Sequence, residues 1–164
     1  MRDAPQEAVR EAALKMLERR RRTRSDLARR LRDKGFDATE IDAVLDRLIA
    51  VGLVNDLEYA RVYLESRWGR RASGWRRLEQ DLRGRGITAA DIAAARAGFD
   101  SSERPASEVE LARRVITQSA RRMAALDAST RRRRLYALLV RRGFDSDAIR
   151  EALASHAREA AAAV

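Results

Sequence analysis

The chain has 164 residues, no cysteine and one histidine, and its 35 Lys and Arg against 25 Asp and Glu give a formal net charge of +10. These numbers exclude a disulfide framework, a thiolate metal site and a His-based zinc site, so no cofactor is expected. The basic excess predicts a polyanionic partner or an acidic groove on a protein. Because no apolar stretch approaches the ~18 residues of a membrane span and no signal-peptide core is present, we expect a cytoplasmic protein with no membrane contact.

Alanine and arginine dominate the chain, proline is rare, and no run of alternating β-branched residues predicts a strand. In chain order, helical segments are expected over residues 6–22, 56–70 and 106–123. Each segment precedes one copy of the same pattern: Leu, three residues, Leu, three residues, Gly, an apolar residue, four residues, Ile. The copies are Leu27, Leu31, Gly35, Phe36 and Ile41; Leu78, Leu82, Gly86, Ile87 and Ile92; Leu135, Leu139, Gly143, Phe144 and Ile149.

Each copy of the pattern predicts two helices joined by a tight turn. The two leucines form an apolar stripe, and the glycine can take the left-handed conformation that ends a helix. The next helix then starts at a capping residue, which is Asp37 in copy one, Thr88 in copy two and Asp145 or Ser146 in copy three. Copy two lacks the leucines that follow the isoleucine in the other copies, so its last helix is expected to be short and thinly packed.

The chain is therefore predicted to be all-α, with three tandem three-helix repeats over residues 1–51, 52–99 and 105–160. One repeat of this size buries little on its own, and stacking neighbours would extend the core. We expect an elongated, curved, solenoid-like rod, of right or left hand, that is a monomer. Residues 98–105 are the most loop-like stretch and are expected to form a hinge.

Arginine clusters fall at equivalent places in the three repeats, which predicts a positive stripe along one side of the rod. Solvated arginine runs are the alternative interpretation. Two tryptophans flank the cluster of repeat two, where they could stack on a base or, equally, pack the helix junction. The candidate binding residues are Arg24, Arg67, Arg70, Arg71, Arg76, Arg77, Arg131, Arg132, Arg133, Arg134, Trp68 and Trp75.

Several motifs resemble those of the RecX regulatory proteins. Residues 52–56, Gly-Leu-Val-Asn-Asp, followed by Tyr59-Ala60 and Arg67, are similar to the signature GLLDD..YA......R of that family. Residues 74–87 resemble its segment G...I..EL..KGI, although Trp75 stands where proline is often found. The resemblance implies three tandem three-helix repeats that bind the RecA filament on DNA. It also implies inhibition of the ATPase, strand exchange and coprotease activities of RecA, which tunes the SOS response and recombinational repair.

Two other function classes are alternatives to this one. A DNA-binding protein of tandem helix-turn-helix-like units, independent of RecA, would use the arginines on single- or double-stranded DNA without reading sequence, because its third helices begin with acidic residues or alanine. An enzyme is not expected, since there is no phosphate-binding glycine loop and no nucleophile–base pair. Carboxylates instead stand at helical spacing from arginines, as Asp26 does from Arg29 and Arg30.

Overall fold

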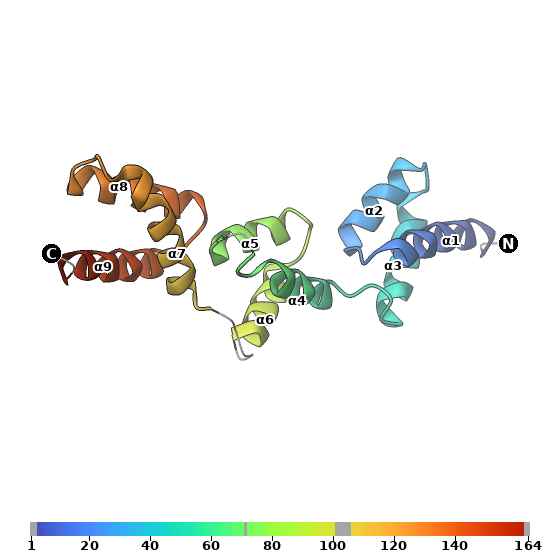
Figure 1. Cartoon of the computed structure of the whole chain (residues 1–164). Helices are drawn as coiled ribbons and strands as arrows, with labels where there is room; N and C mark the ends of the chain where they lie inside the picture. The colour runs from blue at the N-terminus through green and yellow to red at the C-terminus, as the bar shows by residue number, and fades with distance from the viewer. Residues whose placement is uncertain (1–2, 71, 101–105, 163–164) are drawn as a thin grey trace. The chain divides into compact units, whose positions relative to one another are not determined.

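The computed structural model describes residues 3–70, 72–100 and 106–162 (Figure 1). In these residues every regular element is helical, as the sequence predicts, and the helices follow one another as three triplets. The elements are α1 (Asp3–Arg19), α2 (Arg24–Asp33), α3 (Ala38–Ala50), α4 (Asp56–Arg67), α5 (Trp75–Arg83), α6 (Ala89–Asp100), α7 (Glu108–Ala120), the short 3-10 helix η1 (Arg121–Met123), α8 (Ala128–Arg141) and α9 (Ser146–Ala162).

The helices form two compact units, and the second triplet is divided between them. The first unit runs to Tyr63 and adds Leu82–Phe99, so it holds the first triplet with α6 and most of α4. The second unit joins Leu64–Asp81, which includes most of α5, to the chain from Asp100 onward. Each unit therefore contains one junction between consecutive repeats.

The core of the first unit is formed by the predicted apolar stripes. Buried side chains from α1, α2 and α3 meet in one cluster, closed by Val54 after the last of these helices. In α2 the two pattern leucines, Leu27 and Leu31, are fully buried. Phe36, the apolar residue after the glycine, packs against the same cluster. The pattern thus orients α2 and α3 by their shared burial.

The predicted helix endings are confirmed in all three copies. Gly35, Gly86 and Gly143 have φ of +87°, +78° and +77°, the left-handed region in which glycine is favoured. In each case the amide of the following apolar residue donates to the carbonyl of the second leucine. The distance is 3.3 Å in copies one and two and 3.2 Å in copy three. This is the Schellman arrangement, which satisfies carbonyls at the helix end.

The predicted capping residues also stand at the starts of the third helices. Asp37 accepts a hydrogen bond from the amide of Thr39 at 2.8 Å, and the Thr88 hydroxyl accepts one from the amide of Asp91 at 3.1 Å. Helix α9 begins at Ser146, which puts Asp145 in the capping position. These caps fix where the third helices of the repeats begin.

Two expectations about the end of repeat two are wrong. Helix α6 has 12 residues against 13 in α3, so it is not short. Phe99, in its last turn, is 9% exposed and supplies apolar bulk that the missing leucines do not. Residues 98–100 of the expected hinge are instead the last residues of α6, and residues 101–105 lie outside the described residues.

Candidate functional site

Thr23 joins the first repeat to the second. It is the residue before α2, its side chain is 2% exposed, and its hydroxyl accepts from the amide of Asp26 at 3.1 Å. The same hydroxyl donates to the carbonyl oxygen of Arg85 at 2.9 Å, in the turn between α5 and α6. One buried hydroxyl thus caps a helix and holds the turn of the next repeat.

Asp56 makes the second link of this junction. Its Oδ1 accepts from the backbone amide of Arg24 at 2.9 Å, so the first helix of repeat two holds the second helix of repeat one. Burial raises the pKa of the Asp56 carboxyl and the nearby Asp91 adds to the rise, whereas the hydrogen bond from Arg24 opposes it. The cap of α4 is Asn55, whose Oδ1 accepts from the amide of Glu58 at 2.9 Å. In this structure the Asp56 side chain therefore has a structural role, because it binds the backbone of the preceding repeat.

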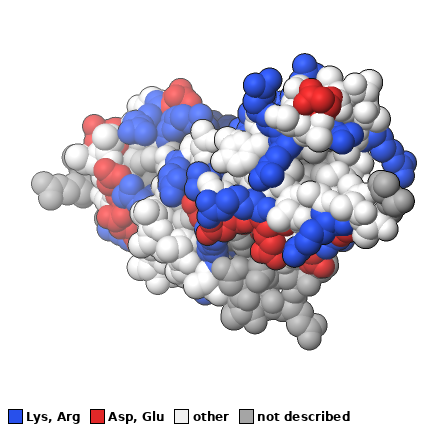
Figure 2. Space-filling model, turned by 90° about the vertical axis from the view of Figure 1, so that its left-hand side faces the viewer, with Lys and Arg blue, Asp and Glu red and all other residues white. Residues whose placement is uncertain are grey.

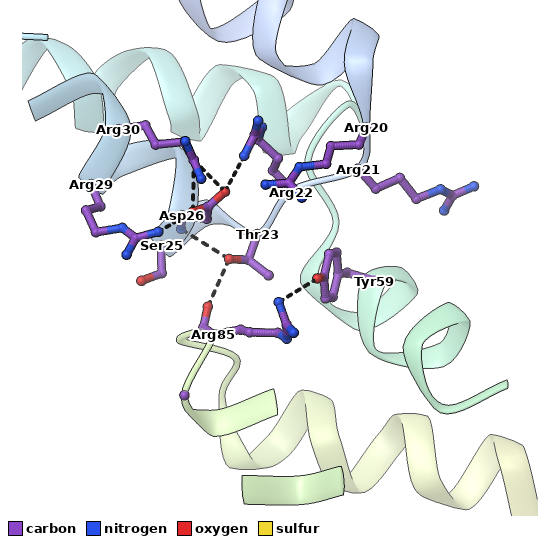
Figure 3. A pocket seen from close by; sticks show the side chains of 11 residues that line it. Arg20, Arg21, Arg22, Thr23, Ser25, Asp26, Arg29, Arg30, Tyr59 and Arg85 are labelled. Atoms are coloured by element: carbon purple, nitrogen blue, oxygen red, sulfur yellow. Dashed lines mark hydrogen bonds and ion pairs between the residues drawn. The ribbon is translucent and has the colours of Figure 1, made fainter. Parts of the chain in front are cut away.

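A hollow of about 390 Å³ opens beside Thr23, and its lining is dominated by arginine (Figure 3). We call it the basic hollow. Six guanidinium groups against the single carboxylate of Asp26 give the lining a formal charge of +5. The lining residues are Arg20, Arg21, Arg22, Thr23, Ser25, Asp26, Arg29, Arg30, Tyr59, Gly84 and Arg85.

Asp26 gathers three of these arginines (Figure 3). Arg22 Nη1 lies 2.7 Å from Asp26 Oδ2, Arg29 Nη2 lies 2.6 Å from Oδ1, and Arg30 Nε lies 3.0 Å from Oδ2. Partial burial raises the pKa of the Asp26 carboxyl, but the hydrogen bonds from the three arginines outweigh it and lower the pKa to about 2. Asp26 is thus ionised at neutral pH, and the pairings of Arg29 and Arg30 predicted from helical spacing are confirmed.

The other three arginines of the hollow are only weakly compensated. Arg21 Nη1 lies 3.5 Å from Glu58 Oε1, and Arg20 forms no ion pair within the part of the chain that the structure describes. Arg85 Nη1 lies 3.3 Å from the Tyr59 hydroxyl, and the guanidinium stands 5.0 Å from the centre of the Tyr63 ring. The two tyrosine partners of Arg85 are uncharged and the pair of Arg21 with Glu58 is long, so the hollow keeps an excess of positive charge.

The second unit contains the equivalent junction, between repeats two and three. Gly74 donates from its amide to the carbonyl of Arg142, and Arg76 donates from its amide to the carbonyl of Gly143, both at 3.0 Å. The amide of Trp75 donates to Glu108 Oε1 at 3.0 Å, as that of Arg24 does to Asp56. A Cβ at Gly74 would lie 2.3 Å from the carbonyl oxygen of Gly143, so the two backbones require glycine here.

Three of the predicted binding arginines pair with carboxylates of their own unit. Arg24 Nη2 lies 3.0 Å from both Asp42 Oδ1 and Asp46 Oδ1. These hydrogen bonds raise the pKa of Arg24, and the one to Asp46 contributes more than the one to Asp42. Arg76 Nε lies 2.8 Å from Asp145 Oδ1. Arg77 Nε lies 3.3 Å from Asp81 Oδ1. Because these guanidinium groups already have partners, they offer fewer donors to a ligand than the sequence suggests.

The two tryptophans pack the helix junction of the second unit, which is one of the two alternatives considered for them. Trp68 and Trp75 are 5% and 3% exposed, with ring centres 4.2 Å apart. The Trp68 indole donates to the carbonyl of Ala106 at 2.9 Å. Stacking on a base requires an exposed ring face, which neither indole has. We do not retain them as contact residues.

The remaining predicted residues fall in the second unit or outside the described residues. Arg67 ends α4 and is exposed, as is Arg70, whereas Arg71 lies outside the described residues. Arg131 is half-buried in the first turns of α8, and Arg132, Arg133 and Arg134 are exposed there. On the face shown in Figure 2, Lys and Arg lie interspersed with Asp and Glu. The stripe that would join the arginine clusters stays a prediction.

The hollow was not among the predicted sites, although part of its signal is visible in the sequence. Arg29 and Arg30 stand three and four residues after Asp26, a spacing that brings them to one face of a helix, and Arg22 stands four residues before it in the segment that precedes α2. Arg85 is visible only as the basic residue before a helix-ending glycine. Its approach to Thr23 spans 62 residues of chain, which local patterns do not show.

Other kinds of site are not seen in the described residues. Residues 3–70, 72–100 and 106–162 contain no group of three or more His, Cys, Asp or Glu side chains placed to hold a metal ion. Among the same residues, none of the helices has the length and apolar character needed to cross a membrane.

Comparison with known proteins gives one consistent result. Three family models match in order: the first RecX three-helix domain over residues 10–48, the second over 55–95 and the third over 106–153. The regulatory protein RecX of Mycobacterium leprae is 36% identical over 147 residues, covering 89% of this chain and 84% of that protein. That of Streptomyces coelicolor is 35% identical over 140 residues, covering 85% and 72%. The crystal structure of RecX from Lactobacillus salivarius matches in fold with a TM-score of 0.82 at 21% identity, over 92% of this chain and 96% of that one.

Proposed function

Because the chain belongs to the RecX family of regulatory proteins, we propose that it binds the RecA–DNA filament and inhibits the ATPase, strand exchange and coprotease activities of RecA. In this role it modulates the SOS response and recombinational repair in the cytoplasm. The observation that supports the proposal most is the ordered match of all three repeats to RecX domains. The net charge of +10 suits a partner that presents DNA phosphate and acidic side chains.

Inhibition has a mechanical cause in this proposal. A chain of stacked repeats, predicted to be an elongated and curved monomer, contacts several protomers of a helical filament at once. Bridged protomers resist the relative motion that hydrolysis and strand exchange require. Contacts along several repeats also make the apparent affinity exceed that of any one of them. The protein needs no cofactor and no catalytic residue for such a role, so we propose that it is not an enzyme.

A second candidate function is sequence-independent binding of single- or double-stranded DNA without RecA. The basic hollow favours it, because guanidinium groups without carboxylate partners are suited to phosphate. The third helices do not favour base reading, since Glu40 in α3 and Asp91 in α6 lie in first turns that would face base edges. The two functions are compatible, and they differ in whether RecA is needed.

Co-sedimentation with cognate RecA filaments tests the proposal. Filaments are assembled on single-stranded DNA with a slowly hydrolysed ATP analogue, and DNA-free RecA and RecA-free DNA serve as references. We expect the chain to pellet with filaments, in proportion to RecA, above the amount carried by DNA alone. A chain that pellets equally with bare DNA would favour the second candidate function instead, and a chain that stays in the supernatant in every mixture would contradict both functions.

A charge-reversed variant tests which arginines contribute. Arg70→Glu/Arg132→Glu/Arg133→Glu changes three predicted contact residues that are exposed and form no ion pair within the described chain. Arg32→Glu/Arg121→Glu/Arg122→Glu is the control, because it makes the same change in net charge at exposed positions outside the predicted stripe. We expect the first variant to lose filament binding about tenfold or more and the control to lose much less. Equal losses would refute the stripe without affecting the family assignment.

A further inference from the structure

We infer that the basic hollow is a binding site for the phosphodiester groups of DNA, and that Asp26 is its positioning residue. This inference deepens the proposed function and rests on it for the presence of DNA in the complex. It assigns the DNA contact of the first unit to the connection between α1 and α2, to α2 itself and to the turn before α6. Among the sequence-predicted residues only Arg24 lies in this unit, and its guanidinium is held by Asp42 and Asp46.

The charge balance of the hollow calls for an external anion. Six arginines and one carboxylate line the hollow, and only three of the arginines contact that carboxylate, so the remaining positive charges repel one another unless an anion is present. Arg20 forms no ion pair in the described chain, and the partners of Arg85 are the phenol and ring of two tyrosines. A phosphate group between these arginines would supply the missing negative charge.

The arginines bound to Asp26 still have donors to offer. A guanidinium carries five N–H groups in a fixed plane. Arg29 contacts Asp26 through Nη2 only, and Arg30 does so through Nε only. Their side chains are 64% and 39% exposed, so the remaining N–H groups can be reached from solvent. Asp26 therefore fixes the two guanidinium planes while leaving donors free, which lowers the entropic cost of binding a ligand.

The arrangement of donors suits phosphate better than a protein carboxylate. The guanidinium groups come from three segments of the chain: Arg20 and Arg21 before α2, Arg29 and Arg30 within it, and Arg85 beyond α5 (Figure 3). A carboxylate presents only two oxygens, which lie in one plane. A phosphate presents oxygens in several directions and can accept from several segments at once. Contacts of this kind position a nucleic acid without reading its sequence.

Binding of a labelled thymidine oligonucleotide of about 30 nucleotides by the full chain, without RecA, tests the site over a series of salt concentrations. Arg20→Ala/Arg85→Ala removes two arginines of the hollow. Arg32→Ala/Arg47→Ala is the matched control, because it removes the same charge from exposed positions of the first unit outside the hollow. We expect the hollow variant to bind about tenfold more weakly, with a salt slope smaller by about 1–2. The control should change affinity by less than about threefold.

The single variant Arg20→Glu separates a loss of binding from a loss of folding, because Arg20 is exposed and makes no ion pair in the described chain. It should weaken oligonucleotide binding with an unchanged thermal transition. Equal losses in the hollow and control variants would overturn the inference in favour of diffuse charge. So would unchanged DNA binding with lost filament co-sedimentation, which would assign the hollow to an acidic protein surface. Failure of the wild-type chain to inhibit RecA, with the oligonucleotide result as expected, would instead refute only the proposed function.

Discussion

The two junctions between repeats are built on the same backbone scheme. In the first, the amide that opens α2, that of Arg24, donates to Asp56 in the first turn of α4. In the second, the amide that opens α5, that of Trp75, donates to Glu108 in the first turn of α7. Both junctions also hold the carbonyl of the basic residue that precedes a helix-ending glycine, Arg85 or Arg142. The repeated sequence pattern thus gives equivalent backbone contacts at the two junctions.

The junctions differ in the chemistry carried on this scheme. The carbonyl of Arg85 is held by the Thr23 hydroxyl, and that of Arg142 by the Gly74 amide. The ion pair Asp26–Arg30 of α2 corresponds to Arg77–Asp81 of α5 with the charges exchanged. Arginine gathers in excess at the first junction, whereas two buried indoles pack the second. A repeated backbone scheme therefore leaves the side chains of the two junctions free to differ, and we propose that those of the first bind an anion while those of the second serve packing.

The substitution with the largest expected effect on stability disrupts only the second junction. Gly74→Ala puts a Cβ 2.3 Å from the Gly143 oxygen and the Phe144 Cα, so the backbones must separate. We expect a loss of about 2–3 kcal/mol in the free energy of unfolding, measured by urea denaturation. Gly98→Ala is the control: its nearest neighbour is 3.9 Å away, and alanine in a helix should add about 0.5–1 kcal/mol. Equal stability of the two variants would contradict the close approach.

The substitution with the next largest expected effect on stability disrupts the first junction. Thr23→Val keeps the shape of the side chain but leaves the amide of Asp26 and the carbonyl of Arg85 without their partner. We expect a loss of about 2 kcal/mol in the free energy of unfolding, because a buried cap and a buried hydrogen bond are removed together. Thr23→Ser retains the hydroxyl and should recover most of this loss. A Val variant as stable as the Ser variant would show that the hydroxyl does not hold the junction.

The carboxylates that link the repeats sharpen the comparison. Glu108 Oε1 accepts from two amides, those of Trp75 and Asp145, whereas Asp56 Oδ1 accepts from that of Arg24. Glu108→Ala is expected to cost about 1.5 kcal/mol and Asp56→Ala about 1 kcal/mol of unfolding free energy. Burial raises the pKa of Asp56 and so opposes the gain from its hydrogen bond, and Asp56→Asn, which keeps an acceptor oxygen without the buried charge, should cost less than Asp56→Ala. A larger loss for Asn than for Ala would contradict this.

The smallest effect concerns acid stability of the first junction. The pKa of Asp26 falls from its ordinary value of 3.8 to about 2 on folding. The folded state then binds fewer protons, so this stabilisation is present above pH 3.8 and is lost as the pH falls through about 2. Allowing for solvent screening, we expect about 1 kcal/mol. Unfolding free energies measured from pH 6 to pH 2 should show this loss in the wild type and not in Asp26→Asn. The same acid dependence in both proteins would contradict the network.

Local signals account for the features that the sequence predicts correctly. Gly35, Gly86 and Gly143 end helices because their backbone conformation is decided within one turn of chain. Asp37 and Thr88 cap helices for the same reason. The pairing of Asp26 with Arg29 and Arg30 follows from helical spacing alone. Such features require no knowledge of the packing between repeats.

Features that depend on distant segments were not predicted. Arg76 pairs with Asp145, 69 residues away, and Arg24 of α2 pairs with Asp42 and Asp46 of α3, 18 and 22 residues away. For Trp68 and Trp75 the sequence leaves base stacking and junction packing equally open, because their burial against each other depends on the junction and not on their spacing. The basic hollow combines both kinds of contact, since Arg85 reaches it only through the fold.

The DNA-dependent ATP hydrolysis of cognate RecA tests the central claim most directly. The rate is measured on single-stranded DNA with the wild-type chain at equimolar and higher ratios to RecA. A regulator that bridges protomers should lower the steady-state rate progressively and should not hydrolyse ATP in the absence of RecA. A rate that stays constant at every ratio, while the chain is folded and binds DNA, would contradict the proposed function.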